Sequence, residues 1–397
     1  MRLALICTEK LPVPSIRGGA IQIMIDGVVP FLAADNDVTV YSITDPDLPQ
    51  YERRSGIRYI RFPAESYVEN VAASLSREGY DVVHVFNRPK HVPHYKSAAP
   101  HSKFVVSLHN EMFDVNKLTD SEGASTIRSV EKIMTVSDYI GSTVTARYPS
   151  AKSKVRTVYS GFDANRYVPV WSEEGSRTRA RLRRKYGLSG KKVILFVGRL
   201  TDKKGPDVLI RSLQQVLAKH RNAALVIVGG KWFSKNSMND YVRQLYAEAK
   251  PYGNRVIFTQ FVPASEIPDY FLMGDVFVCS SQWQEPLARV HYEAMASGIP
   301  IVTTKRGGNA EVIHHRVNGL LVKDYQSPTA FANAINYMFS HPEEAKRMAL
   351  KGRQMVKADF TFSHVAGRLT KVYKEAYGMA TVSRRKGRNR CGIRRKS

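Results

Sequence analysis

The sequence predicts an α/β protein with two doubly wound, Rossmann-like domains, each built on a parallel sheet. The chain of 397 residues exceeds one ordinary domain, and its hydrophobic fraction of 43% is enough for two cores. Short apolar runs alternate with helical or loop stretches along both halves, which is typical of strands covered on both faces. Ligands of such domains bind beyond the carboxyl ends of the strands.

The expected strands are short apolar runs, which in the first half cover residues 3–7, 38–43, 57–62, 81–86, 103–109 and 132–137. The second half repeats this rhythm over residues 193–198, 224–229, 256–261, 276–281, 300–304 and 319–322. A polar stretch at 163–175 separates the halves and precedes a charged helix expected over 177–186. The last expected helix covers 362–377, and periodicity leaves open whether it packs on its own domain or crosses back.

These patterns divide the chain into an N-terminal domain (1–165), a C-terminal domain (166–360), a C-terminal helix (361–380) and a tail (381–397). The tail has no acidic residue and carries eight of the 25 net positive charges. Such a basic, apolar-poor segment is expected to be disordered and able to touch nucleic acid, an anionic polymer or an acidic partner. The 17 remaining charges favour substrates with phosphate or carboxylate groups, although solubility alone accounts for much of such a charge.

Several classes of protein are excluded or disfavoured. No apolar stretch approaches the roughly 18 residues that span a bilayer, and the five-residue apolar core of MRLALICTEK is too short for a signal peptide. The three cysteines, Cys7, Cys279 and Cys391, form no CxxC pair, which argues against a disulfide framework or a thiolate metal site. We therefore expect a cytoplasmic protein without a transmembrane segment. Nucleic acid is an unfavoured partner, because only the tail supports it and no known nucleic-acid-binding motif is present.

The segment 280–300, SSQWQEPLARVHYEAMASGIP, contains two carboxylates eight positions apart. It follows an expected strand and is expected to open a helix near Pro286, so Glu285 would lie in the loop and Glu293 on the helix. That separation is about 12 Å along a helix, comparable to an extended nucleotide-sugar. The helix N-terminus between them would offer unpaired amides to a diphosphate. The alternative is a capping acid followed by an acid on the helix surface.

This segment resembles the signature of the family 4 retaining glycosyltransferases of GT-B fold, in which Glu, seven residues and Glu precede Ala-Met and a small-Gly-x-Pro turn. The resemblance implies that the donor binds mainly to the C-terminal domain and the acceptor to the N-terminal one. Glu285 would contact donor-sugar hydroxyls and Glu293 would accept both ribose hydroxyls, as the two oxygens of a carboxylate allow.

The segment departs from the family at Leu287-Ala288-Arg289, where many members have Phe-Gly-Leu. We expect Leu287, Ala288 and Arg289 to contact the donor. The change either rebuilds donor specificity or marks a weakened enzyme.

A second match is FVGRLTDKKG at 196–205. The resemblance implies that Arg199 and Lys204 grip the donor diphosphate, whereas Lys203 faces solvent. Two preorganised cations in a dry cleft can stabilise the charge of a departing diphosphate without a metal. We therefore expect no metal and no cofactor beyond the nucleotide-sugar donor, UDP- or GDP-linked. Alternatively, Arg199 forms a surface ion pair and Lys204 is a solvated loop residue.

Other matching stretches add candidates around the same cleft. The Gly18-Gly19 loop lets backbone amides approach a ligand, and in the family it faces the donor. The resemblance places His109 near the reacting sugar, whereas a histidine at the end of a strand is more often structural. Glu111 is expected to orient His109 or to contact the acceptor. The resemblance also places Gly307 and Gly308 of a Gly-Gly-x-x-Glu loop beside the donor sugar, and an interdomain turn at 160–163.

The function expected from this resemblance is a retaining, metal-independent, hexosyltransferase-type transfer from a nucleotide-diphosphate sugar to a hydroxyl of a glycan, lipid or protein. Stretches 8–22, 107–113, 136–143, 156–163, 229–233 and 279–295 are similar to a member attached to the bacterial endospore coat, which implies mother-cell synthesis, deposition on the spore and coat-protein partners.

The sequence is also compatible with two other functions. A structural coat component would keep the fold and bind sugar or polymer without turnover. A metal-dependent GT-A transferase would use Asp45-Pro46-Asp47, which has the DxD form but is more readily interpreted as a turn.

Overall fold

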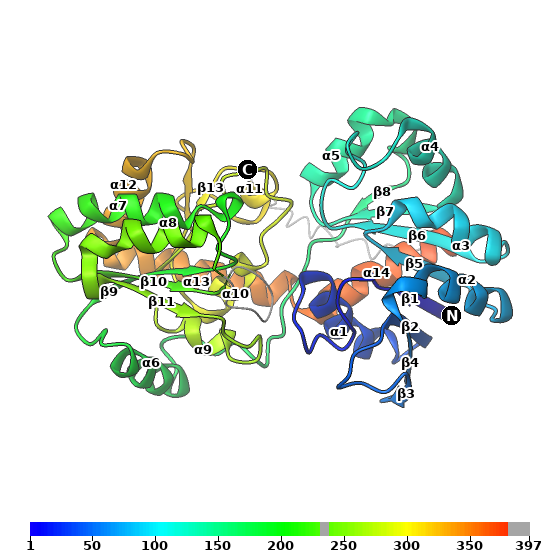
Figure 1. Ribbon diagram of the computed structural model, residues 1–397, viewed down its shortest axis with the longest axis horizontal. Coiled ribbons are helices and arrows are strands. Elements are labelled where there is room, and N and C mark those ends of the chain that lie inside the picture. Colours follow the sequence, from blue (N-terminus) through cyan, green and yellow to red (C-terminus); the bar gives the residue numbers. More distant parts are fainter. Residues whose placement is uncertain (231–237, 380–397) are drawn as a thin grey trace, which may run out of the picture.

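The computed structural model describes residues 1–230 and 238–379, which form two α/β lobes (Figure 1). The basic tail with Cys391 and most of the matching stretch 229–233 lie outside the described residues. Among the helices of the described ranges, none is long and apolar enough to cross a membrane.

The N-terminal lobe contains an eight-stranded sheet, in which only the pair β3–β4 is antiparallel. In spatial order its strands are β3 (Tyr51–Arg54), β4 (Ile57–Phe62), β2 (Asp37–Ile43), β1 (Arg2–Ile6), β5 (Val82–Phe86), β6 (Lys103–Leu108), β7 (Lys132–Thr135) and β8 (Val155–Thr157). The strand order reverses between β1 and β5, so the crevice that such a sheet offers to a ligand opens beyond the end of β1.

The C-terminal lobe contains a six-stranded sheet whose pairs are all parallel. In spatial order its strands are β11 (Val256–Gln260), β10 (Ala223–Val228), β9 (Lys192–Val197), β12 (Val276–Cys279), β13 (Ile301–Thr304) and β14 (Leu320–Val322). This order is that of a doubly wound sheet, with its switch point between β9 and β12. The predicted fold class, two Rossmann-like domains, is confirmed.

Helices cover both sheets (Figure 1). Their bounds are α1 (Ala20–Leu32), α2 (Tyr67–Arg77), α3 (Val92–Ala98), α4 (Asp120–Ser129), α5 (Asp138–Arg147), α6 (Glu173–Lys185), α7 (Pro206–Lys219), α8 (Asp240–Ala249), α9 (Ile267–Phe271), α10 (Val290–Ser297), α11 (Asn309–Val312), α12 (Pro328–Ser340), α13 (Pro342–Asp359) and α14 (Phe362–Tyr377). The helix expected at 177–186 begins earlier, at Glu173, because the Ser172 hydroxyl caps it by accepting a hydrogen bond from the Gly175 amide.

The last helix, α14, packs on α1 and on strands β5, β6 and β7 of the N-terminal lobe (Figure 1). Val365 and Leu369 are fully buried in the core of that lobe, and the Tyr373 hydroxyl lies 2.8 Å from Nδ1 of His84 on β5. The chain therefore passes between the lobes twice, once before α6 and once between α13 and α14.

The two crossings lie side by side. Phe162 donates its amide to the carbonyl of Phe360 at 3.0 Å, and Phe362 donates its amide to the carbonyl of Phe162 at 3.1 Å. Thr361 thereby pairs with Phe162 as an isolated parallel bridge. We refer to residues 160–162 and 360–362 as the crossing segments.

Candidate functional site

A cavity of about 890 Å³ opens between the lobes at the carboxyl ends of the central strands. The N-terminal lobe contributes the loop after β1, including Gly18 and Gly19, and the C-terminal lobe contributes the loops after β9, β10 and β11. Among the predicted site residues, the cavity is lined by Gly18, Gly19, Arg199, Arg289 and Glu293. The structure thus brings residues from three separate sequence motifs to one cleft.

Lys204 and Glu285 form an ion pair with a Nζ–Oε2 distance of 2.6 Å, in which the carboxylate is buried and the lysine is partly exposed. The Ser281 hydroxyl, at 2.7 Å, and the Trp283 indole N–H, at 2.9 Å, donate to the same carboxylate oxygen. Burial would raise the pKa of Glu285, but the ammonium and these donors outweigh it and hold the pKa below its ordinary value. Glu285 is therefore a fixed negative charge, and Lys204 is no freely solvated loop residue.

The backbone around Lys204 is held against the loop that carries Glu285. Lys204 ends a single 3-10 turn after β9, and the Ser280 hydroxyl donates to the carbonyls of Lys204 and Gly205. Gly205 has φ +63°, and a Cβ at this position would collide with the carbonyl of Ser280. Lys203 is exposed, as expected, with its ammonium 5.3 Å from the centre of the Trp283 ring.

Gly307 and Gly308 pack on the backbone of Glu285. The Gly308 amide donates to the Glu285 carbonyl at 2.9 Å. Gly307 has φ +52°, and a Cβ there would overlap that same carbonyl. The two glycines therefore allow the loop after β13 to contact the Glu285 loop closely, as the Lys204 loop also does.

Arg289 and Glu293 lie on the wall of the cleft and contact each other, with a Nη2–Oε1 distance of 3.2 Å. Glu293 is 8% exposed. Arg289 also donates to the carbonyl of Gly161 at 2.9 Å, and its guanidinium lies 5.9 Å from the centre of the Phe362 ring. Arg289 thus connects Glu293 to both crossing segments.

The expected start of the helix after Glu285 is wrong. Helix α10 begins at Val290, four residues after Pro286, so the stretch between the two glutamates is mostly loop. The amides of His291, Tyr292 and Glu293 donate to carbonyls of Ala288 and Arg289, so they are not the unpaired donors expected for a diphosphate.

The side chains of Leu287 and Ala288 are buried in the core of the C-terminal lobe, so the predicted contact of these two residues with the donor, which stays a prediction, would involve their backbone. The apolar side chains gain more from burial than from lining a polar cleft. Ala288 is not among the residues with positive φ, so alanine replaces the family's glycine here without backbone strain.

His109 follows the last residue of β6 with its ring 5.9 Å from that of Phe86 and its Nε2 buried without a hydrogen-bond partner. Burial, and to a lesser degree the charge of Arg289, lower the pKa of His109 to about 3, so the ring is neutral near pH 7. Glu111 was expected to orient His109 or contact acceptor. Its carboxylate instead accepts a hydrogen bond from the Tyr139 hydroxyl.

The two aspartates of the DxD sequence bind an arginine of the Gly18-Gly19 loop. Arg17 donates to Asp45 at 2.8 and 3.0 Å and to Asp47 at 2.5 Å, and the Asp47 amide donates to the Asp45 carboxylate. The residues form a turn, as the sequence favoured. In the described part of the chain, no three histidine, cysteine, aspartate or glutamate side chains gather in a way that could hold a metal ion.

Ser281 and Trp283, which donate hydrogen bonds to the Glu285 carboxylate, are not among the site residues predicted from the sequence. Both lie within four residues of Glu285, and tryptophan occurs only three times in the chain. This proximity in sequence could have indicated that they contact Glu285. The partners of Arg289 in the crossing segments left no such signal, because they are distant in sequence.

Two family models match most of the chain. Residues 24–166 match "Glycosyltransferase Family 4", and residues 178–355 match "Glycosyl transferases group 1". YtcC of Bacillus subtilis, which carries a glycosyltransferase name, is 52% identical over 94% of this chain and 92% of its own length. The chain belongs to glycosyltransferase family 4. Spore coat protein SA of the same organism is 48% identical over 94% of this family 4 chain and 100% of its own length.

Two solved structures share the fold of this chain. Anabaena HepE, in a crystal structure with UDP-glucose, has a TM-score of 0.76 and 22% identity, covering 94% of this chain and 98% of HepE. Sucrose-phosphate synthase of Thermosynechococcus elongatus has a TM-score of 0.77 and 22% identity, covering 95% and 99% of the two chains. The chain is thus a glycosyltransferase with the GT-B arrangement of two Rossmann-like domains.

Proposed function

We propose that this protein transfers a sugar from a nucleotide-diphosphate sugar to a hydroxyl acceptor with retention of configuration and without a metal ion. The observations that carry the proposal are the Lys204–Glu285 ion pair and the cleft between the lobes, which is lined by Arg199, Arg289 and Glu293. This arrangement offers cations for a diphosphate and carboxylates for hydroxyl groups at either end of it. The HepE complex with UDP-glucose supports a UDP-linked donor.

In this proposal each side chain performs one part of the reaction. Arg199 and Lys204 hold the diphosphate and stabilise the charge that develops as the sugar leaves. Glu285 accepts hydrogen bonds from sugar hydroxyls, and Glu293 from the ribose. The acceptor hydroxyl attacks from the face that the diphosphate leaves, and the departing diphosphate takes its proton. Gly18 and Gly19 bring backbone amides near the donor from the other lobe.

We further propose synthesis in the cytoplasm of a mother cell and deposition on the spore coat, with coat proteins as partners. Spore coat protein SA supports this proposal, because it matches along its whole length. The same relative favours a second candidate, a coat component that keeps the fold without turnover. In that case, Lys204 with Glu285 and Arg289 with Glu293 would serve as structural pairs.

A thermal-shift screen of the purified chain against UDP- and GDP-sugars tests donor binding, because specific binding stabilises by an amount that grows with ligand concentration. Donor hydrolysis or transfer, measured with and without EDTA, then tests turnover and metal independence. We expect one nucleotide-sugar to stabilise the protein and the rate to be unchanged by EDTA. Binding without turnover would support the coat component, and activity that vanishes with EDTA and returns with manganese would contradict the metal-independent mechanism.

A further inference from the structure

Glu311 of the C-terminal lobe binds the first turn of α5 in the N-terminal lobe. Its two carboxylate oxygens accept hydrogen bonds from the amides of Asp138, at 2.7 Å, and Tyr139, at 2.8 Å. The first amides of a helix have no partner within the helix and carry partial positive charge, so a carboxylate suits them. Gly308 packs against Ser137, the N-cap residue of α5. A Cβ added at Gly308 would lie only 2.8 Å from the Cβ of Ser137.

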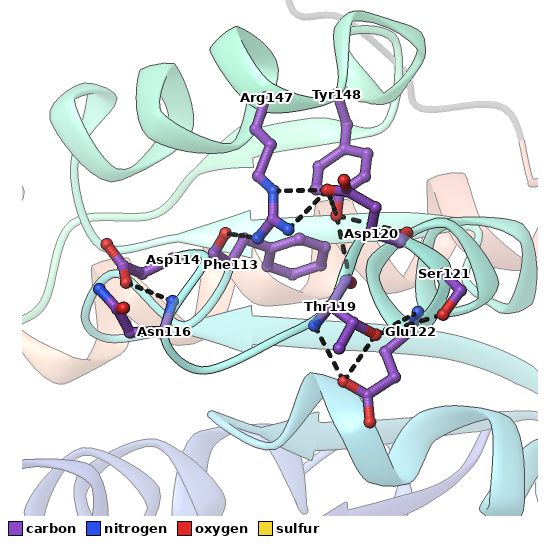
Figure 2. Close-up of polar contacts among 9 residues, drawn as sticks. All are labelled: Phe113, Asp114, Asn116, Thr119, Asp120, Ser121, Glu122, Arg147 and Tyr148. Atoms are coloured by element: carbon purple, nitrogen blue, oxygen red, sulfur yellow. Dashed lines mark hydrogen bonds and ion pairs between the residues drawn. The ribbon is translucent and has the colours of Figure 1, made fainter.

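Helix α5 in turn holds the loop between β6 and α4 (residues 109–119, the β6–α4 loop) at two places. In its first turn, the Tyr139 hydroxyl donates to the carboxylate of Glu111. At its last residue, Arg147 donates to the carbonyl of Phe113 at 2.6 Å and binds Asp120 at the start of α4, also at 2.6 Å (Figure 2). Movement of α5 must therefore carry this loop with it.

The far part of the β6–α4 loop is also fixed internally (Figure 2). The Asn116 amide donates to the Asp114 carboxylate at 2.9 Å. Thr119 and Glu122 form a reciprocal capping box at the start of α4. These bonds connect the loop, which begins at His109, to α5 and to the start of α4.

We propose that Glu311 is a positioning residue that fixes the β6–α4 loop relative to the donor side of the cleft through α5. Glu311 lies on α11, which directly follows the Gly307-Gly308 loop that contacts the backbone of Glu285, so the contact joins the proposed donor side of one lobe to the proposed acceptor side of the other. This inference rests on the proposed function for its effect on the rate, but not for the contact itself.

Three substitutions in the full chain test the inference. Glu311→Gln keeps one acceptor oxygen and removes the charge, Tyr139→Phe cuts only the tie to Glu111, and Glu343→Gln makes the same charge change in the first turn of α13, on the exposed surface. Amide hydrogen exchange reports on the contact, and steady-state hydrolysis or transfer of the nucleotide-sugar reports on the rate.

For Glu311→Gln we expect exchange in residues 138–142 and in the β6–α4 loop to accelerate about fivefold, and kcat to fall about tenfold with the donor KM within about threefold. Tyr139→Phe should accelerate exchange in the loop alone, and Glu343→Gln should match the wild type. Wild-type exchange in Glu311→Gln, or faster exchange with unchanged kcat, would overturn the inference. If wild-type protein hydrolyses no donor, the proposed function fails, while the exchange data still decide whether the contact positions the loop.

Discussion

The ammonium of Lys204 and the carboxylate of Glu285 lie 2.6 Å apart, although 81 positions separate them in the chain. Neither group is freely available to solvent, because their side chains are 22% and 7% exposed. A buried carboxylate held by one ammonium and two neutral donors keeps its negative charge and its orientation. The positions and charges of the two groups are therefore fixed before a ligand binds, unlike those of a pair of flexible surface side chains.

Loss of Lys204 should reduce both stability and activity. We expect Lys204→Met to lower the free energy of unfolding by about 2–3 kcal/mol, because it leaves a buried charge unpaired. Urea unfolding measures this change, and Lys203→Met at the exposed neighbour is the matched control. The double variant Lys204→Met/Glu285→Gln should recover most of the stability and none of the activity. Recovery of activity would contradict the role of the pair in turnover.

Arg199 should matter for the rate because it lines the cleft where the diphosphate is proposed to bind. Removing a charge-assisted contact of roughly 1.5–3 kcal/mol predicts that Arg199→Ala lowers kcat/KM at least about tenfold. Initial rates at varied donor concentration measure this effect. Arg177→Ala, which removes an exposed ion pair with Glu173 on α6, should leave the rate unchanged. An Arg199→Ala enzyme with normal turnover would reject the assignment.

Arg289 should couple Glu293, the proposed ligand of the ribose, to the crossing segments. In Arg289→Met, Glu293 loses its cation while remaining buried, so we expect nucleotide affinity to fall about tenfold. Isothermal titration calorimetry with the nucleotide identified in the screen measures the affinity. Lys351→Met, at an exposed position on α13, is the control. Tighter binding in Arg289→Met would mean that the arginine competes with the ribose for Glu293.

Buried His291 should make the protein less stable in mild acid. Burial lowers the pKa of His291 from 6.5 to about 4, while the unfolded chain keeps its ordinary pKa. Between pH 6.5 and about 4 the unfolded state therefore binds more protons, and stability falls as the pH falls. His291→Gln should flatten this slope in thermal unfolding, whereas His101→Gln, at an exposed position, should not. An unchanged slope in His291→Gln would show that other groups cause the acid sensitivity.

Apolar periodicity identified most of the fold, and its failures have physical causes. All twelve expected strands are present to within about two residues at each end, since a strand buried on both faces must be apolar throughout. Strands β3 and β8 were missed. The first reads YERR and is mostly exposed at a sheet edge, and the second has only three half-buried residues.

The motifs of the site could be predicted from the sequence, but the contacts between them could not. The Glu285 and Lys204 loops could be recognised separately, but a pairing between them depends on strand order, which no local pattern contains. The start of α10 was misplaced because Pro286 fits a first helical turn as readily as it fits the loop. The contact of Glu311 with α5 depends on how the lobes are placed, so it could not be read from the chain.

The paired crossing segments restrict how the two halves of this enzyme can move. Because both connections pass through one place and bond to each other, they oppose sliding of the halves past each other at this place. A cut in the polypeptide between 163 and 172 would leave the second connection intact, with α14 still anchored in the opposite core. A molecule cut at this place should therefore keep its two lobes together. A partner or substrate that enters the cleft between the lobes would then meet the same arrangement of its two walls each time.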